Sequence, residues 1–170
     1  AIRYAKIFDR VLSFEPIPEL YEALVANTSS LSNIEVHNVA ISDSIGTSII
    51  HQDFHNSGVS MLENEETTEQ LQSRQRPNRN RNGHPVTIDT ITIDSLELDE
   101  VDFIKIDTEG YNLPPLNGMV QTLNRCSPVI QMERSVNNRQ IAEKFLYDQG
   151  YTQVSSIKQD DVYTKIDNTI

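Results

Sequence analysis

The stretch DFIKIDTEG, residues 102–110, decides the fold that the sequence predicts. Ile104 and Ile106 alternate with Phe103 and Lys105, which is the period of a β-strand with two different faces. Acidic residues and a glycine follow at the point where this strand is expected to end. A short, largely apolar strand that ends in polar residues before a helix is typical of a buried strand in an α/β sheet.

Strand and helix patterns alternate on both sides of this stretch. Strands are expected at 11–14, 34–41, 47–50, 86–93 and 128–132, and helices at 19–26, from Pro114 to Leu123 and between Asn137 and Gly150. Two further strands, 151–154 and 162–165, follow each other closely. The order predicts an α/β fold with a mostly parallel sheet and an antiparallel C-terminal edge.

The length of 170 residues suits one domain, which we expect to span 1–170. Residues 51–85 are polar, and 72–84 (QSRQRPNRNRNGH) are rich in Arg, Asn and Gln, so we expect a polar flap or insertion there. The arginines of this segment are interpreted either as solvated or as holding an anionic or sugar substrate.

The net charge of −11 disfavours binding to nucleic acid or to an anionic membrane. The single cysteine, Cys126, cannot form an internal disulfide, which fits a reducing compartment. No apolar run approaches the roughly 20 residues of a membrane helix, and the N-terminus lacks the layout of a signal peptide. A cytoplasmic protein is therefore expected, and its oligomeric state, including a homo-oligomer, stays open.

Acidic residues follow several of the expected strands, namely Glu15, Asp107, Glu109 and Glu133. In open α/β sheets, ligands bind beyond the carboxyl ends of the strands. The Glu15 carboxylate could accept hydrogen bonds from a ribose, or it could simply lie favourably near the start of a helix. The sequence leaves both interpretations open.

Lys105 is expected on the same face of its strand as Phe103 and Asp107. A lysine between Ile104 and Ile106 requires an acidic partner, for which Asp102 and Asp107 are the candidates. Such a pair is interpreted either as part of a site or as a structural ion pair. The histidines lack the spacing of metal ligands, so no metal site is expected.

These motifs resemble the FkbM family of methyltransferases, a branch of the class I methyltransferase fold. The similarity runs from about residue 10 to 135 and rests on FEP (14–16), Asn27, AIS (40–42) with Gly46, SGVS (57–60), TIDSL (92–96), DFIKIDTEG (102–110), Leu116-x-Gly118 and Glu133. The resemblance implies a Rossmann-like sheet. It also implies an O-methyltransferase that uses S-adenosyl-L-methionine on a hydroxyl of a sugar, glycoconjugate or secondary metabolite.

The resemblance assigns roles to particular residues. Cofactor contacts are expected from Glu15 at the ribose, from the adjoining Pro16, from Asn38, Val39 and Ala40 beside the adenine, and from Asp107. Asp107 and Glu109 would border the acceptor, with Lys105 orienting one of them. Asp107 is the preferred general base, ahead of His55 in the polar segment. The partner would be a small-molecule or glycan acceptor.

Two departures from the family pattern stand out. The family's D-x-G-x-x-x-G loop is not found, and residues 1–8 resemble only the helix that follows it, so the first strand is expected to be missing. Tyr111-Asn112 follows Gly110 where the family has a further Glu. A catalytically inactive, methyltransferase-like binding or structural module is therefore the alternative function. A nucleotide-sugar or dinucleotide-binding domain is a third, although no G-x-G-x-x-G motif is present.

Overall fold

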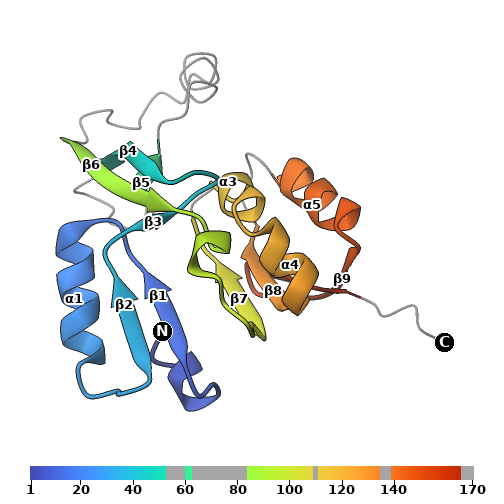
Figure 1. Cartoon of the computed structure of the whole chain (residues 1–170), viewed down its shortest axis with the longest axis horizontal. Coiled ribbons are helices and arrows are strands. Elements are labelled where there is room, and N and C mark those ends of the chain that lie inside the picture. Colours follow the sequence, from blue (N-terminus) through green and yellow to red (C-terminus); the bar gives the residue numbers. More distant parts are fainter. Residues whose placement is uncertain (53–59, 63–83, 109–110, 135–138, 166–170) are drawn as a thin grey trace.

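The computed structural model describes residues 1–52, 60–62, 84–108, 111–134 and 139–165. In these residues the strands form three sheets (Figure 1). The first pairs β1 (Val11–Phe14) with β2 (Ile34–His37), in parallel. The second has the order β7 (Phe103–Ile106), β8 (Val129–Glu133), β10 (Asp160–Lys165), β9 (Tyr151–Ile157). The third has the order β3 (Ala40–Ile41), β6 (His84–Ile91), β4 (Gly46–Gln52), β5 (Ser60–Leu62).

The helices begin and end where the residue types favour it. They are η1 (Tyr4–Lys6), α1 (Pro18–Thr28), η2 (Asp94–Leu96), α3 (Leu113–Asn117), α4 (Val120–Cys126) and α5 (Arg139–Asp148). Proline opens α1 and lies in the first turn of α3, where its fixed φ suits a helix and no backbone donor is lost. Gly150, with a φ of +83°, follows α5 and allows the chain to turn directly into β9.

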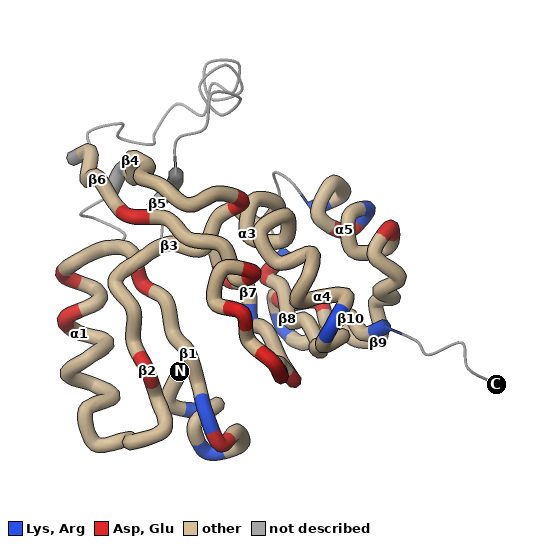
Figure 2. The backbone as a smooth tube through the Cα atoms, viewed as in Figure 1, with Lys and Arg blue, Asp and Glu red and all other residues tan. Residues whose placement is uncertain are grey.

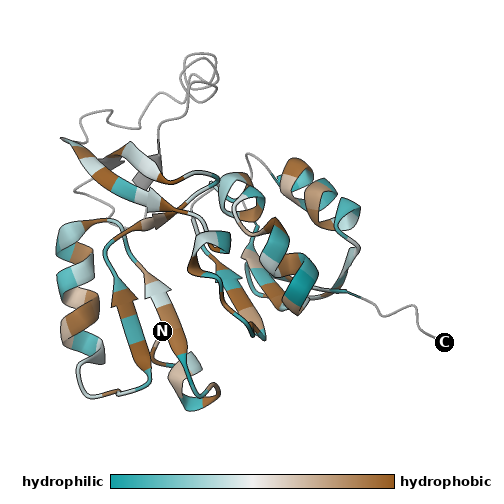
Figure 3. Ribbon diagram, in the orientation of Figure 1, coloured by the Kyte–Doolittle hydropathy of each residue, from teal (hydrophilic) through white to brown (hydrophobic). Residues whose placement is uncertain are grey.

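The larger core lies between the second sheet and α3, α4 and α5. Its buried members include Ile106 of β7, Ile130 and Met132 of β8, and Leu116 and Leu123 of the helices. Alternate residues of these strands face the helices, and Figure 3 shows the matching alternation of apolar and polar positions on β7. The predicted antiparallel C-terminal edge is confirmed, because β10 is antiparallel to both β8 and β9.

An aromatic cluster covers the opposite face of β7. The Phe103 ring lies 5.1 Å from that of Tyr4 and 5.7 Å from that of Phe8, measured between centroids. Tyr4 belongs to η1, which is much shorter than the helix expected over residues 1–8. This short helix therefore links the beginning of β1 to the beginning of β7.

Strands β1 and β7 run in the same direction. Phe8, before β1, contacts Phe103 at the start of β7, and Phe14 at the end of β1 packs against the core that contains Ile106 at the end of β7. Within the described residues no strand pairs with the second edge of β1 or of β7. β1 and β7 are therefore joined by side-chain contacts rather than by a hydrogen-bond ladder in the described residues.

The third sheet differs from what the sequence predicts. β6 pairs with β3 in parallel but with β4 in antiparallel fashion, so the sheets together are more mixed than expected. β4 extends to Gln52, β5 lies at 60–62 and β6 begins at His84, so the expected polar flap at 51–85 contains strand residues at its borders. The rest of that segment lies outside the described residues.

The helix expected from Pro114 to Leu123 is divided at Gly118. A Cβ at Gly118 would lie 1.9 Å from the Ser42 carbonyl oxygen, so the chain passes directly against the residue that follows β3. The second part, α4, receives a separate N-terminal cap. Asp94 accepts hydrogen bonds from the backbone N–H groups of Gln121 and Thr122, at 2.9 and 2.8 Å, and from the Thr122 hydroxyl at 2.7 Å.

Candidate functional site

Glu15 directly follows β1 and lies close to the start of α1. Its backbone N–H donates to the His37 carbonyl at 3.0 Å, which extends the pairing of β1 with β2. Its carboxylate Oε1 accepts from the backbone N–H of Ile17 at 3.0 Å, as the helix-start interpretation anticipates. Partial burial raises the pKa of Glu15 and outweighs the opposite effect of this hydrogen bond. A carboxylate has about four acceptor positions, and the described residues use one of them.

Asn38 ties the segment after β2 to the segment after β1. Its amide Nδ2 donates to the backbone carbonyls of Glu15 and Pro16, at 2.9 and 3.0 Å. Val39 is half-buried and Ala40 is buried in the smaller core with Ile17. The structure thus brings together five of the residues expected to hold the cofactor, from Glu15 and Pro16 to Asn38, Val39 and Ala40, although the Asn38 amide is engaged by the backbone.

Lys105 lies on the face of β7 that also carries Phe103, as predicted. Its Nζ lies 3.3 Å from Asp107 Oδ2 and 2.9 Å from Asp160 Oδ1. Burial alone would lower the pKa of Lys105, but the hydrogen bonds and charges of Asp160 and Asp107 outweigh it, so the pKa is raised. Of the two candidate partners, Asp107 is confirmed and Asp102 is not an observed partner. Asp160 did not figure among the candidates.

Asp160 begins β10, opposite Glu133 at the end of β8. Its second carboxylate oxygen accepts a hydrogen bond from the side-chain amide of Gln131 on β8. The Tyr4 hydroxyl donates in turn to Gln131 Oε1 at 3.2 Å. Partial burial would raise the pKa of Asp160, but the hydrogen bonds from Lys105 and Gln131 and the nearby positive charges lower it overall. The acid is therefore held in its ionised form.

The loop after β7 contacts both neighbouring parts of the fold. The Tyr111 and Ser42 hydroxyls are 3.1 Å apart, and the Tyr111 ring packs against the core that contains Ile17 and Ala40. Asn112 is buried, accepts from the Thr108 hydroxyl at 2.7 Å and donates to the Glu133 carbonyl at 3.2 Å. The two residues that depart from the family pattern thus connect the loop after β7 with the ends of β3 and β8.

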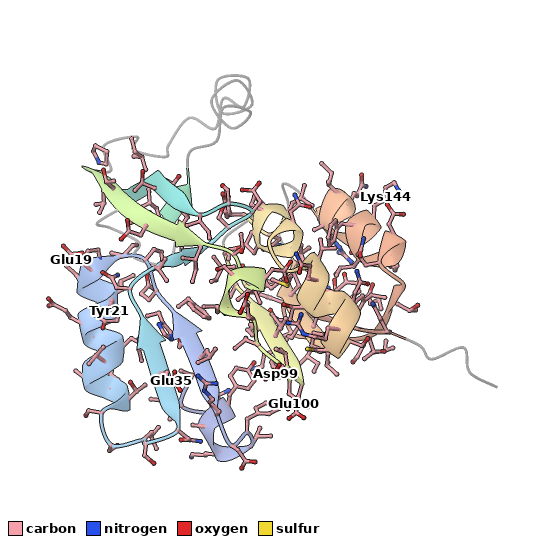
Figure 4. The ribbon with its side chains drawn as sticks, in the orientation of Figure 1. Glu19, Tyr21, Glu35, Asp99, Glu100 and Lys144 are labelled. Carbon is pink, nitrogen blue, oxygen red and sulfur yellow. The ribbon has the colours of Figure 1, made fainter. Side chains whose placement is uncertain are left out.

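These contacts place Glu15 and Asp107 at one edge of the molecule. Tyr111, in the loop after β7, packs against the smaller core, and this core includes Ile17 and Ala40, each two residues after Glu15 and Asn38. Figure 4 places Asp99 and Glu100, which precede β7, toward the end of the molecule where Glu35 of β2 lies. Strands β1, β2 and β7 therefore all end at the opposite edge, where Glu15, Asn38 and Asp107 lie.

His55 and Glu109 lie outside the described residues, and the roles expected for them stay predictions. The sequence analysis missed Asp160, Gln131 and Asn112. Gln131 lies between the apolar residues Ile130 and Met132, whereas Asp160 lies in a polar run between Gln159 and Asp161. Neither local pattern signals the contact of Asp160 with Lys105, which joins positions 55 residues apart in the chain.

In the described part of the chain, no three His, Cys, Asp or Glu side chains gather in a way that would hold a metal ion. Acidic positions are spread over all parts of the fold (Figure 2). The described helices include none long and apolar enough to cross a membrane.

Parallel strands with polar residues at their carboxyl ends, together with helices that follow them, define a Rossmann-like α/β protein. A model of the methyltransferase FkbM domain matches residues 2–153. The chain therefore belongs to the FkbM methyltransferase family.

One solved structure carries the comparison of folds. It is a crystal structure of methyltransferase FkbM from Methylobacillus flagellatus KT, with 17% sequence identity and a TM-score of 0.54. The match covers 92% of this chain and 36% of that chain, so residues 1–170 span about a third of the length of the matched protein. At this identity the likeness concerns the fold. No curated protein matches the sequence.

Proposed function

We propose that the chain contributes the cofactor-binding and acceptor-facing edge of an O-methyltransferase that uses S-adenosyl-L-methionine. The acceptor would be a hydroxyl of a sugar, a glycoconjugate or a secondary metabolite. Membership of a methyltransferase family supports the reaction class. The observation that carries the proposal is the placement of Glu15 and Asp107 at one edge, at the ends of strands that run in the same direction.

The residues at the end of β1 suit the ribose of such a cofactor. The Glu15 carboxylate is half-buried and keeps acceptor positions that no described residue fills. Two neighbouring hydroxyls of a ribose would fill these positions with charge-assisted hydrogen bonds. Val39 and Pro16, both half-buried beside it, would offer apolar surface to the adenine. When bound, the cofactor would supply an electrophilic methyl group.

Asp107 has the properties of a group that could receive the proton of the acceptor hydroxyl. Its side chain is 57% exposed, and Lys105 contacts one of its two oxygens, Oδ2. No described residue donates to the other oxygen, so Asp107 can accept a hydrogen bond from a bound hydroxyl while the lysine fixes its orientation. Alignment of this kind supplies a large part of catalysis in group transfer.

Isothermal titration calorimetry with S-adenosyl-L-methionine on the full chain tests the cofactor assignment. We expect Glu15→Gln to weaken binding roughly tenfold or more, because one acceptor oxygen becomes an NH₂ donor and the other loses its negative charge. Glu19→Gln is the matched control, since Glu19 lies in the first turn of α1 on the exposed surface (Figure 4). Equal affinity of the Glu15→Gln variant and the wild type would contradict the role of Glu15.

The alternative is a methyltransferase-like module that binds or supports another component without catalysis. Within residues 1–170 no described contact requires catalysis, so this alternative is tested together with the enzyme. The same calorimetry separates the two functions. Binding of S-adenosyl-L-methionine by the full chain supports the enzyme, and the lack of binding supports the inactive module.

A further inference from the structure

We propose that Asp160, in the C-terminal hairpin, is a positioning residue that fixes Lys105 and, through Lys105, the carboxylate of Asp107. Its importance for catalysis rests on the function proposed above. The physical coupling between Asp160 and Asp107 does not, because it follows from the contacts alone.

The contacts form one continuous chain across four elements. Tyr4 of η1 donates to Gln131 of β8, Gln131 donates to Asp160 of β10, and Asp160 pairs with Lys105 of β7. Lys105 then contacts Asp107 after the end of β7. All the members on strands lie on the face that the aromatic cluster of Tyr4, Phe8 and Phe103 partly covers.

The two acids that contact Lys105 are not equivalent. The Asp160 side chain is 18% exposed and lies at 2.9 Å from Nζ, whereas the Asp107 side chain is 57% exposed and lies at 3.3 Å. An ion pair with so exposed a partner is weak, and lysine has a long, flexible side chain. Asp107 alone therefore would not hold Lys105 in one position, whereas the half-buried and hydrogen-bonded Asp160 would.

Gln131 makes Asp160 a rigid partner. The Tyr4 hydroxyl donates to the amide oxygen of Gln131, which directs the amide NH₂ group toward Asp160. One Asp160 oxygen is then bound by Gln131 and the other by Lys105. The same lysine thus has an anchored acid on one side and a solvent-facing acid on the other.

A purely structural role for Asp160 would be to attach the C-terminal hairpin to β8. The hairpin already has other attachments, however. Residues 160–163 pair along β8, the Arg134 backbone N–H donates to the Gln159 carbonyl at 2.8 Å, and the buried Asp161 forms an ion pair with Arg139 at 3.1 Å. The contact of Asp160 with Lys105 is the one that connects the hairpin to Asp107 at the end of β7.

Carbon-13 NMR of the full chain, labelled in the aspartate carboxyl groups and the lysine side chains, tests the coupling. The Asp107 signal is assigned by its loss in Asp107→Asn and the Lys105 signal by its loss in Lys105→Met. In Asp160→Asn we expect the pKa of Lys105 to fall, since one of its two acidic partners is lost. We also expect the Asp107 carboxyl resonance to shift, in the same direction as in Lys105→Met, and Asp160→Glu to restore part of both changes.

Asp148→Asn is the matched control. Asp148 pairs with Lys144 at 2.6 Å on the exposed side of α5, and Figure 4 shows Lys144 on α5 at the outer edge of the molecule, away from β7. This variant removes an acid from a lysine elsewhere and should leave the Lys105 and Asp107 signals unchanged. Asp107 and Asp160 are the acidic groups that raise the pKa of Lys105. Lys105 and Arg134 are the positive charges that lower the pKa of Asp160.

An unchanged Asp107 resonance in folded Asp160→Asn, with a shifted one in Lys105→Met, would overturn the proposal. If Asp160→Asn does not fold, Gln131→Leu replaces it, because this variant keeps Asp160 and removes the hydrogen bond that Gln131 donates to it. A smaller shift of Asp107 in the same direction supports the proposal, and no shift overturns it. Failure of the wild-type chain to bind S-adenosyl-L-methionine would refute the proposed function alone and would leave these resonances to decide the coupling.

Discussion

At the scale of single residues, Glu15 combines a binding role with a cost to stability. Its carboxylate is half-buried and accepts one hydrogen bond from the described residues, so burial disfavours the ionised form. A ligand that supplies hydrogen-bond donors would relieve this penalty. Such a residue is typical of a site that is completed by its ligand.

The raised pKa of Glu15 gives a prediction for stability. The folded state holds a proton on Glu15 at pH values where the unfolded chain, with a pKa near 4.5, has lost it. The free energy of unfolding therefore falls as the pH rises from the unfolded pKa through the folded pKa. We expect Glu15→Gln to melt at a higher temperature than the wild type at pH 7, with a difference that shrinks toward pH 4, as measured by scanning calorimetry.

Glu19→Gln again serves as the control, and it should follow the wild type at both pH values. A Glu15→Gln variant that is less stable than the wild type at pH 7 would show that the hydrogen bond from Ile17 outweighs the burial of the charge. Together with the calorimetry of cofactor binding, the result would show whether the Glu15 carboxylate lowers the stability of the folded protein while it raises the affinity for the cofactor.

At the scale of elements, the close passage of Gly118 against the residue that follows β3 holds two parts of the fold together. Gly118 lies between α3 and α4, and its carbonyl also accepts from the Asp94 backbone N–H at 3.0 Å. A side chain at this position would meet backbone rather than a movable side chain. The neighbouring Ser42 is the residue that contacts Tyr111 in the loop after β7.

We expect Gly118→Ala to destabilise the protein by about 1–3 kcal/mol, the usual range for an added group in a packed region. Gly46→Ala is the matched control, because a Cβ there has no atom within 4 Å and Gly46 does not have a positive φ. Urea denaturation of the two variants measures the difference. Similar midpoints for Gly118→Ala and Gly46→Ala would show that β3 and α3 move apart at little cost.

The elements with strong local signals were predicted well. β1 has the predicted bounds, and β7, β8, α1 and α5 lie within a few residues of theirs, because apolar periodicity and proline or glycine boundaries are local properties. The antiparallel pairing of β4 with β6 and the Asp160–Lys105 contact were not predicted. Both join residues far apart in the chain, and a local pattern does not specify which partner a strand or a charge selects.

At the scale of the whole molecule, the separation of the sheets determines which part of the fold unfolds locally first. In the described residues β1 and β2 share no hydrogen-bond ladder with the second sheet, and no residue of either strand is fully buried. The second sheet lies against the larger core, in which Leu116, Leu123 and Ile130 are fully buried. Side-chain contacts such as those of Phe8 and Phe14 join the two parts.

We therefore expect backbone amides in β1 and β2 to exchange with deuterium more than about tenfold faster than those in β8 and β10. Hydrogen exchange of the full chain, followed by mass spectrometry or NMR, measures this ratio. Equal protection of the two parts would mean that they open as one cooperative unit.

The position of β10 has a practical consequence for anyone who trims the protein. The family match ends at residue 153, whereas β10 begins at Asp160. A chain cut at the family boundary would lose the neighbour of β8 and would expose a fresh strand edge, which favours aggregation. It would also leave Lys105 with a single, solvent-exposed counter-ion. Loss of activity in such a shortened protein would say little about the chemistry of the family and much about the missing hairpin.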